Sequence, residues 1–149
     1  MRSSPGEGGH SFSRRVSCPG FIERQIEDAR QRGYASTLFG RRLYLPDLAS
    51  SNGAARSFAE RVAVNMPIQG SAADLMKLAM IRVHGALKGS VPSARLLLQV
   101  HDELLVEAPE ADAEAAGRLM RWEMERCFPL RVPLEVSVGT GRNWLDVHT

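Results

Sequence analysis

The sequence predicts an α+β fold, in which an antiparallel sheet packs against long helices. Two observations carry this prediction. Leucine and valine dominate residues 94–107 on both sides of a short polar cluster, as expected of a β-hairpin built from two buried strands. Apolar residues recur at helical spacing over 54–87 and again over 110–128. With 149 residues, the chain is long enough to bury a moderate core.

Charge is unevenly distributed along the chain, although the net charge is only +2. Residues 1–61 contain ten arginines against six acidic residues, whereas residues 62–149 contain nine basic residues against eleven acidic ones. Seventeen of the nineteen basic residues are arginine, the side chain best suited to bidentate phosphate contacts. A GC-rich genome also favours arginine codons, so this bias alone does not establish nucleic-acid binding.

The cysteines and the termini indicate the compartment. Cys18 and Cys127 lie far apart and fit no zinc or redox spacing. No apolar run approaches the ~20 residues that span a bilayer, and the N-terminus lacks the apolar core of a secretory signal. We therefore expect a cytoplasmic protein with reduced thiols and no membrane partner.

The N-terminal third predicts one helix and one hairpin. Residues 1–20 are rich in Ser, Gly, Pro and Arg and are expected to be disordered or extraneous. An amphipathic helix is expected over 21–30, followed by a hairpin over 35–46 that turns near Gly40. At its tip, Arg41 and Arg42 either contact a phosphate or form an ordinary solvated surface.

A long helical region is expected from 54 to 87, with Ser51 or Asn52 as its N-cap. Pro67 lacks a backbone donor and disfavours helix at the residue before it, so an interruption is expected there. The four residues from Ser71 to Asp74 have the pattern of a capping box that restarts the helix. The part that follows is apolar nearly all round and is expected to be buried.

Two stripes run along the first half of this helical region. Phe58, Val62 and Met66 form an apolar stripe, and beside it lies a polar stripe at four-residue spacing, Arg61, Asn65 and Gln69. These three polar side chains can donate to base edges, sugars and phosphates. They equally suit a solvated helix face with no ligand.

The C-terminal third predicts a helix and a strand. Acidic residues gather at the start of the segment 110–128 and arginines near its end, which complements the helix dipole. Its inner face is expected to consist of small and apolar side chains: Ala113, Ala116, Met120, Met124 and Cys127. Alternating apolar residues over 130–138 favour a further strand of the same sheet.

The tip of the central hairpin is the candidate site. His101 and Asp102 occupy the turn, although a two-residue turn favours Asn-Gly or Asp-Gly because its residues need positive φ. Such local conflicts concentrate at functional or strained positions. Asp102 and Glu103 can offer oxygen ligands to a hard divalent cation. Alternatively, they are solvated residues that end a strand.

The string Gln99-Val100-His101-Asp102-Glu103 between apolar strands resembles motif C of the family A DNA polymerases, the bacterial polymerase I type. Residues 32–47 are similar to the end of that family's fingers, 59–74 to its DNA-contacting palm helix, and 132–144 to its C-terminal strand and tail. The resemblance covers roughly residues 21–148, with the motifs in the family's order.

This resemblance implies a partial polymerase palm, with a motif C hairpin packed against long helices and a remnant of the fingers. It divides the chain into an extraneous segment (1–20), the end of the fingers (21–55) and a partial palm (56–149). The implied function is template-directed nucleotidyl transfer in DNA replication and repair, with two Mg²⁺ ions as cofactor. The implied partners are primer–template DNA and deoxynucleoside triphosphates, at the bacterial nucleoid.

The resemblance also implies roles for individual residues. Asp102 corresponds to a metal-binding carboxylate, Glu103 to its acidic neighbour and His101 to a residue near the primer terminus. The remaining matches correspond to contacts with the template–primer minor groove: Arg61, Asn65, Gln69 and Gln99.

Residues 1–149 depart from the family pattern in two places. They contain no match to the motif A aspartate, and none to the helix that grips the incoming nucleotide. We therefore expect a C-terminal part of a polymerase that is weakly active or inactive alone, with the missing N-terminal part as a partner. Two alternatives stay open: a non-catalytic DNA-binding module, and a metal-dependent hydrolase that uses His101, Asp102 and Glu103.

Overall fold

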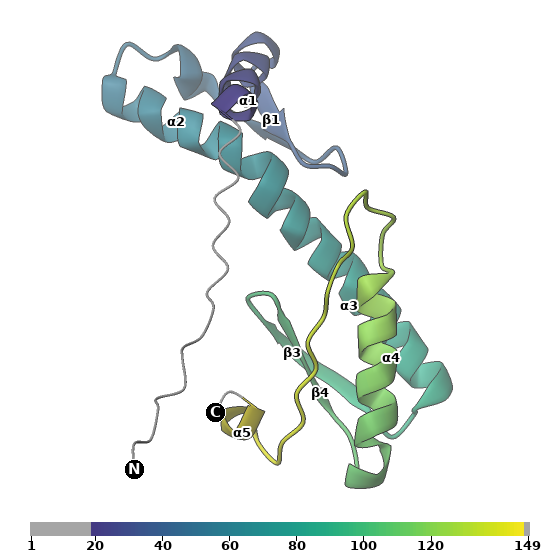
Figure 1. The fold of residues 1–149 in the computed structure, drawn as a ribbon. Coiled ribbons are helices and arrows are strands. Elements are labelled where there is room, and N and C mark those ends of the chain that lie inside the picture. Colours follow the sequence, from purple (N-terminus) through teal and green to yellow (C-terminus); the bar gives the residue numbers. More distant parts are fainter. Residues whose placement is uncertain (1–18, 148–149) are drawn as a thin grey trace, which may run out of the picture.

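The structure is a computed structural model that describes residues 19–147. The segment 1–20, expected to be extraneous, lies outside the described residues except for its last two. Figure 1 shows a long helical rod, α2 and α3, that joins two groups of elements. One end carries α1 with the hairpin β1–β2, and the other end carries the hairpin β3–β4 with α4. This mixture of helices and small antiparallel sheets confirms the α+β prediction.

The first group consists of α1 (Pro19–Arg32), β1 (Tyr34–Ser36), β2 (Arg42–Tyr44) and the 3₁₀ turn Pro46–Ala49. Gly33 ends α1 with a φ of 76°, and Gly40 takes a φ of 80° in the hairpin turn, a conformation that costs glycine little. The predicted helix and hairpin are confirmed.

A first apolar core holds this group against α2 (Gly53–Asn65). Its buried members are mostly small, which lets the helices approach closely: Ala29, Ala35, Leu45, Leu48, Ala59, Ala63 and Met66. Of the apolar stripe, Met66 lies in this core and Val62 packs against it, whereas Phe58 is 60% exposed under the guanidinium of Arg61. This core contains residues from both sides of residue 55, where the boundary between fingers and palm is predicted. The division into fingers and palm stays a prediction.

The rod starts at Asn52, whose Oδ1 accepts a hydrogen bond from the backbone N–H of Ala54 at 2.9 Å. One of the two predicted N-caps is thereby confirmed. At the predicted interruption, the chain stays helical through a wide π-helical turn (Met66–Gly70) and continues as α3 (Ser71–Ser90). The turn accommodates Pro67 without ending the helix.

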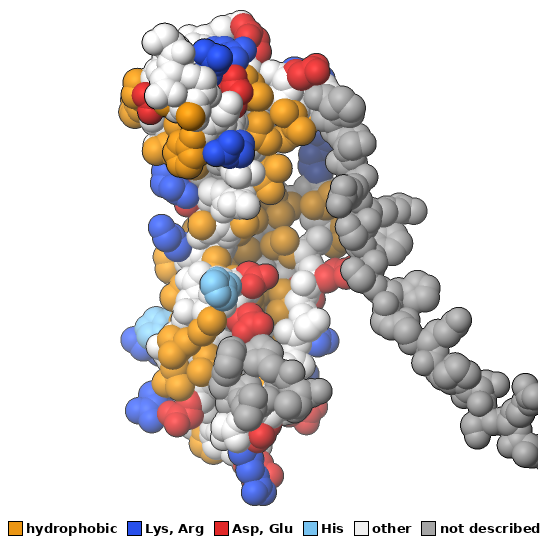
Figure 2. Space-filling model, turned by 90° about the vertical axis from the view of Figure 1, so that its left-hand side faces the viewer, with side chains coloured by type: hydrophobic (Ala, Val, Ile, Leu, Met, Phe, Trp, Pro, Cys, Tyr) orange, Lys and Arg blue, Asp and Glu red, His pale blue; other side chains and the backbone are white. Residues whose placement is uncertain are grey.

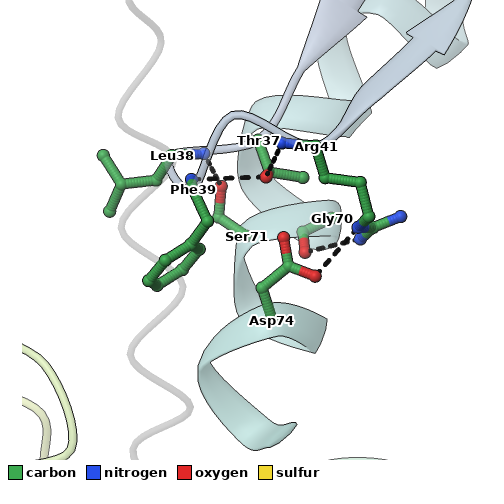
Figure 3. A network of polar contacts seen from close by, with 7 residues as sticks. All are labelled: Thr37, Leu38, Phe39, Arg41, Gly70, Ser71 and Asp74. Carbon is green, nitrogen blue, oxygen red and sulfur yellow. Dashed lines mark hydrogen bonds and ion pairs between the residues drawn. The ribbon is translucent and has the colours of Figure 1, made fainter. Parts of the chain in front are cut away.

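The predicted capping box is wrong. Gly70 and Ser71 both have helical φ and ψ, whereas an N-cap residue must lie outside the helix. Ser71 is instead a buried residue inside the rod. The side chains of Ser71 and Asp74 face the turn between β1 and β2, as Figure 3 shows.

The second half of the rod is buried on one side, not all round as predicted. Ala79 is buried, and Val83 and Leu87 lie in a second apolar core, whereas Ile81 on the opposite side is 69% exposed. The helix has neighbours on one flank, since it packs against α4 (Ala113–Glu125) and the hairpin. An ion pair between Arg82 and Glu123 at 2.8 Å supports the helix–helix contact.

The second core fills the angle between α3, α4 and the hairpin formed by β3 (Arg95–Val100) and β4 (Glu103–Glu107). A 3₁₀ turn, Glu110–Asp112, precedes α4. Ala116, Met120 and Met124 pack in this core, which confirms the predicted inner face at these positions. Cys127 is half-buried beyond the end of α4, where burial raises the pKa of its thiol.

The strand predicted over 130–138 is not formed. These residues run as an extended segment without ladder pairing, beside α4, to a last helical turn, α5 (Trp144–Val147) (Figure 1). The backbone N–H of Val136 reaches Glu125 Oε1 at 3.4 Å, and Val138 Cγ1 lies 3.1 Å from the position of a Cβ added at Gly117. The alternating pattern thus serves packing on a helix. No helix within residues 19–147 has the length and apolar character to cross a lipid bilayer.

Candidate active site

The turn of the β3–β4 hairpin has the predicted geometry. Val100 pairs with Glu103, which leaves His101 and Asp102 as the two turn residues. His101 has a φ of 53°, an uncommon conformation for a residue with a side chain. Its carbonyl oxygen accepts a hydrogen bond from Gln99 Nε2 at 2.7 Å. This bond braces the strained turn from the preceding strand.

A bulge lies further down the same hairpin. Leu96 pairs with Val106 and Leu98 with Leu105, so Leu97 is an extra residue in β3. A bulge of this kind bends the strand and strengthens its twist. Leu97 and Leu98 are both about half exposed, which leaves apolar surface on the side of the hairpin away from the core.

The acidic residues at the tip are accessible. His101, Asp102 and Glu103 are all exposed. Figure 2, seen from the side toward which the hairpin tip points, shows a histidine and acidic side chains gathered on this face, with apolar side chains above them. The exposed carboxylate of Asp102, at this braced turn, can coordinate a cation from solvent.

The donor set at the tip suits one side of a cation site. Carboxylate oxygens are the hard ligands that Mg²⁺ prefers, and the tip presents Asp102 with Glu103 beside it. Within residues 19–147, no group of three or more His, Cys, Asp or Glu side chains is placed to hold a metal ion. The described residues at the tip therefore suit one side of a magnesium site and do not form a complete one.

The polar stripe lies on the rod. Arg61, Asn65 and Gln69 are all exposed, the first two on α2 and the third in the π-helical turn. A π-helical turn holds more residues than an α-helical turn, so each residue rotates less about the axis. Residues four apart therefore stay close to one line, and Gln69 extends the stripe as expected of an uninterrupted helix.

The structure gives Arg41 and Arg42 partners that the sequence patterns do not indicate. Arg41 Nε donates to Asp74 Oδ1 at 2.9 Å, and its Nη2 donates to the carbonyl of Gly70 at 3.1 Å (Figure 3). The guanidinium of Arg42 lies 4.6 Å from the centre of the Tyr34 ring. Contact of either arginine with a phosphate stays a prediction. Local patterns do not pair residues 33 positions apart, which is why the contact with Asp74 was missed.

Comparison with known proteins places this hairpin and rod in a family. The family model described as DNA polymerase family A matches residues 12–146. This chain belongs to DNA polymerase family A. The match includes α1, both hairpins, the rod and α4, so nearly all described elements belong to the polymerase fold.

Curated family A relatives are similar over most of this chain. A thermostable DNA polymerase I of Thermus filiformis is 57% identical over 126 residues, which cover 85% of this chain and 15% of that protein. DNA polymerase I of Bacillus caldotenax is 52% identical over 126 residues, 85% of this chain and 14% of that protein. The chain thus spans about 15% of the length of these relatives.

A solved family A structure has the same arrangement of elements. It is described as the POL domain of Pol1 from M. smegmatis in complex with DNA primer-template and dNTP. The superposition gives a TM-score of 0.84 at 50% identity, and covers 88% of this chain and 23% of that one. The fold that the resemblance implies, a partial polymerase palm, is therefore confirmed.

Proposed function

We propose that this chain forms the part of a family A DNA polymerase that holds the primer–template end and supplies one carboxylate of the metal site. The observation that carries the proposal is the hairpin tip, which presents Asp102 exposed at a braced, strained turn. The family match and the 50–57% identity to polymerases support it. We place the protein with DNA in the bacterial cytoplasm.

The polar stripe supports the DNA-binding half of this proposal. Arg61 can donate to phosphates or base edges, and Asn65 and Gln69 offer amide groups that both donate and accept. All three are exposed along the rod, on α2 and the π-helical turn, as a surface that follows a groove requires. Gln99 is also exposed, and its second amide hydrogen stays available while the first bonds the carbonyl of His101.

The metal half of the proposal assigns a ligand role to Asp102, with Glu103 beside it. When bound, Mg²⁺ would activate the primer 3′-hydroxyl and stabilise charge on the leaving pyrophosphate. This chain's own contribution is to hold the Asp102 carboxylate at a fixed point and to keep His101 next to the primer terminus. The second carboxylate of a two-metal site, and the grip on the nucleotide, come from polymerase residues outside 1–149.

A binding experiment tests this proposal. We expect the chain to bind a primed duplex with an affinity that falls steeply with salt. The slope of the logarithm of the binding constant against the logarithm of the salt concentration should be about −2 or steeper. We expect no primer extension with Mg²⁺ by the chain alone. Fluorescence anisotropy over a salt series measures the first, and gel-resolved extension measures the second. Affinity that does not depend on salt would contradict the proposal, and robust extension would contradict the assignment of half a metal site.

Asp102→Asn is expected to leave DNA binding unchanged, whether the chain takes part in catalysis or only binds DNA, because that residue is proposed to serve the metal. Should the chain also fail to support catalysis when the remaining palm is supplied, the same surface would describe a non-catalytic DNA-binding module. The accessible stripe favours this as the second candidate function.

A further inference from the structure

We propose that Arg41 and Asp74 are positioning residues: they clamp the turn between β1 and β2 onto the π-helical turn and so hold Gln69 in the DNA-contacting stripe. The inference rests on the proposed function, because it gives Gln69 its role at DNA. The clamp is defined as Thr37, Leu38 and Arg41 of the hairpin turn together with Gly70, Ser71 and Asp74 of the rod (Figure 3).

The clamp contacts lie immediately after Gln69 in the chain. Arg41 Nη2 donates to the carbonyl oxygen of Gly70 at 3.1 Å. The backbone N–H of Leu38 donates to Ser71 Oγ at 2.8 Å. These two bonds come from the turn between β1 and β2, and they fix the two residues that follow Gln69. A wide turn with fewer close backbone contacts than an α-helix gains most from such external support.

The ion pair anchors the clamp one turn further along α3. Arg41 Nε lies 2.9 Å from Asp74 Oδ1, and the Asp74 side chain is only 12% exposed. Its second oxygen, Oδ2, is buried and accepts no hydrogen bond of normal geometry from the described residues. A carboxylate placed in this way is costly without its arginine, because a buried charge left unpaired strongly destabilises its surroundings.

Thr37 orders both sides of the clamp. Its hydroxyl oxygen accepts from the backbone N–H of Arg41 at 3.2 Å and of Phe39 at 3.3 Å, so its own proton must point elsewhere. Figure 3 shows this side chain beside the carboxylate of Asp74. The Thr37 hydroxyl lowers the pKa of Asp74 most, burial opposes this, and Arg41 lowers it further. The carboxylate therefore stays charged and keeps its arginine.

Packing at Gly70 shows how closely the two elements meet. A Cβ added at Gly70 would lie 2.8 Å from Thr37 Cγ2 and 3.0 Å from Met66 Sδ. Thr37 is buried and cannot rotate away without breaking the two hydrogen bonds to its hydroxyl. The hairpin turn also contacts the segment after α4, where Phe39 and Phe128 pack edge to face at 4.7 Å. The clamp is therefore a tight, multipoint contact.

Four variants of the full chain test the clamp. Arg41→Gln and Asp74→Asn break the ion pair, and Gly70→Ala forces the elements apart without a change in charge. Arg42→Gln is the matched control, because it removes the same charge from the neighbouring residue. Amide hydrogen exchange at Leu38 is expected to be at least about tenfold faster in the three clamp variants and unchanged in the control.

DNA affinity gives the second readout, measured with a primed duplex. Removal of a carboxylate near DNA should strengthen binding if only charge mattered, whereas the clamp predicts that Asp74→Asn weakens binding about tenfold. Gln69→Ala is expected to cost a similar factor in the unaltered chain but almost nothing further in Asp74→Asn. Arg61→Ala, on α2, keeps its full effect in both backgrounds.

Two results would overturn the proposal. Unchanged exchange at Leu38 in Arg41→Gln and Asp74→Asn would show that no clamp exists. Independent, additive effects of Asp74→Asn and Gln69→Ala on affinity would show that the clamp does not act through Gln69. If the unaltered chain fails to bind the primed duplex, the proposed function falls together with the role at DNA. The exchange measurement still decides separately whether the clamp forms.

Discussion

Asp102→Ala is expected to reduce primer extension about a thousandfold once the rest of a polymerase is present, the scale for losing one group that stabilises developing charge. The assay needs a complete metal site, and a chimera provides one. In it, the 126 matched residues of this chain replace the corresponding segment of the Thermus filiformis polymerase, with which they are 57% identical. The reason for the large effect is that Asp102 is proposed to bind the metal directly, while DNA is held by other residues.

The matched control is Glu107→Gln on the same hairpin. Glu107 is an exposed carboxylate, 59% accessible, that pairs with Arg95 at 3.2 Å. Exposed pairs of this kind contribute little, so the chimera should keep its activity within about twofold. Steady-state extension rates and DNA affinity are measured for each variant. An Asp102→Ala chimera that extends primers at the unaltered rate would rule out the proposed ligand role.

Arg61→Ala is expected to weaken binding of the chain to a primed duplex by roughly ten- to a hundredfold, the range for loss of a specific arginine contact. The salt slope should become shallower by about one, because one phosphate or groove charge is no longer neutralised. Arg61 is exposed in the middle of α2, where its guanidinium already lies over the Phe58 ring. The aromatic contact holds it on the surface without removing its donors.

Two comparisons separate this effect from a general loss of charge. Lys88→Ala removes one positive charge from an exposed position in the last turn of α3 and should change affinity little. Asn65→Ala should weaken binding but leave the salt slope unchanged, because the amide is neutral. Equal losses in Arg61→Ala and Lys88→Ala would mean that the stripe is not a DNA contact.

The elements of this fold with strong local signals were predictable. The hairpin with His101 and Asp102 at its tip was correctly predicted because two apolar runs flank one polar interruption, and strand pairing leaves no other place for the turn. The helix over 54–65 was predictable from its spacing and its Asn52 cap. The polar stripe was placed correctly on the surface because side-chain period follows helix geometry whether or not the turn widens.

The errors share one physical cause, which is that periodicity encodes burial but not the partner. The alternation over 130–138 predicts a strand, yet those residues pack on α4 without backbone pairing. The apolar residues after Ser71 predict burial all round, but α3 has neighbours on one flank, so Ile81 is left exposed. Which surface covers an apolar side chain depends on elements far away in the sequence.

The misreading of Asp74 shows the same limit for polar residues. A serine followed three residues later by an acid has the pattern of a helix start. The backbone there is already helical, and Asp74 turns to Arg41, 33 positions away. No local rule predicts that contact. The contact forms only when the β1–β2 hairpin is folded onto the rod.

The most direct test of the central claim is a photochemical cross-link from the hairpin tip to DNA. The backbone at position 102 can accept a benzophenone-bearing residue, because the positive φ of the turn belongs to His101. The same residue at position 88 serves as the control. Irradiation of the chain with a primed duplex should attach position 102 to the terminal nucleotide of the primer, and position 88 to neither strand. Cross-links from position 102 to the duplex interior, or to no DNA, would contradict the account.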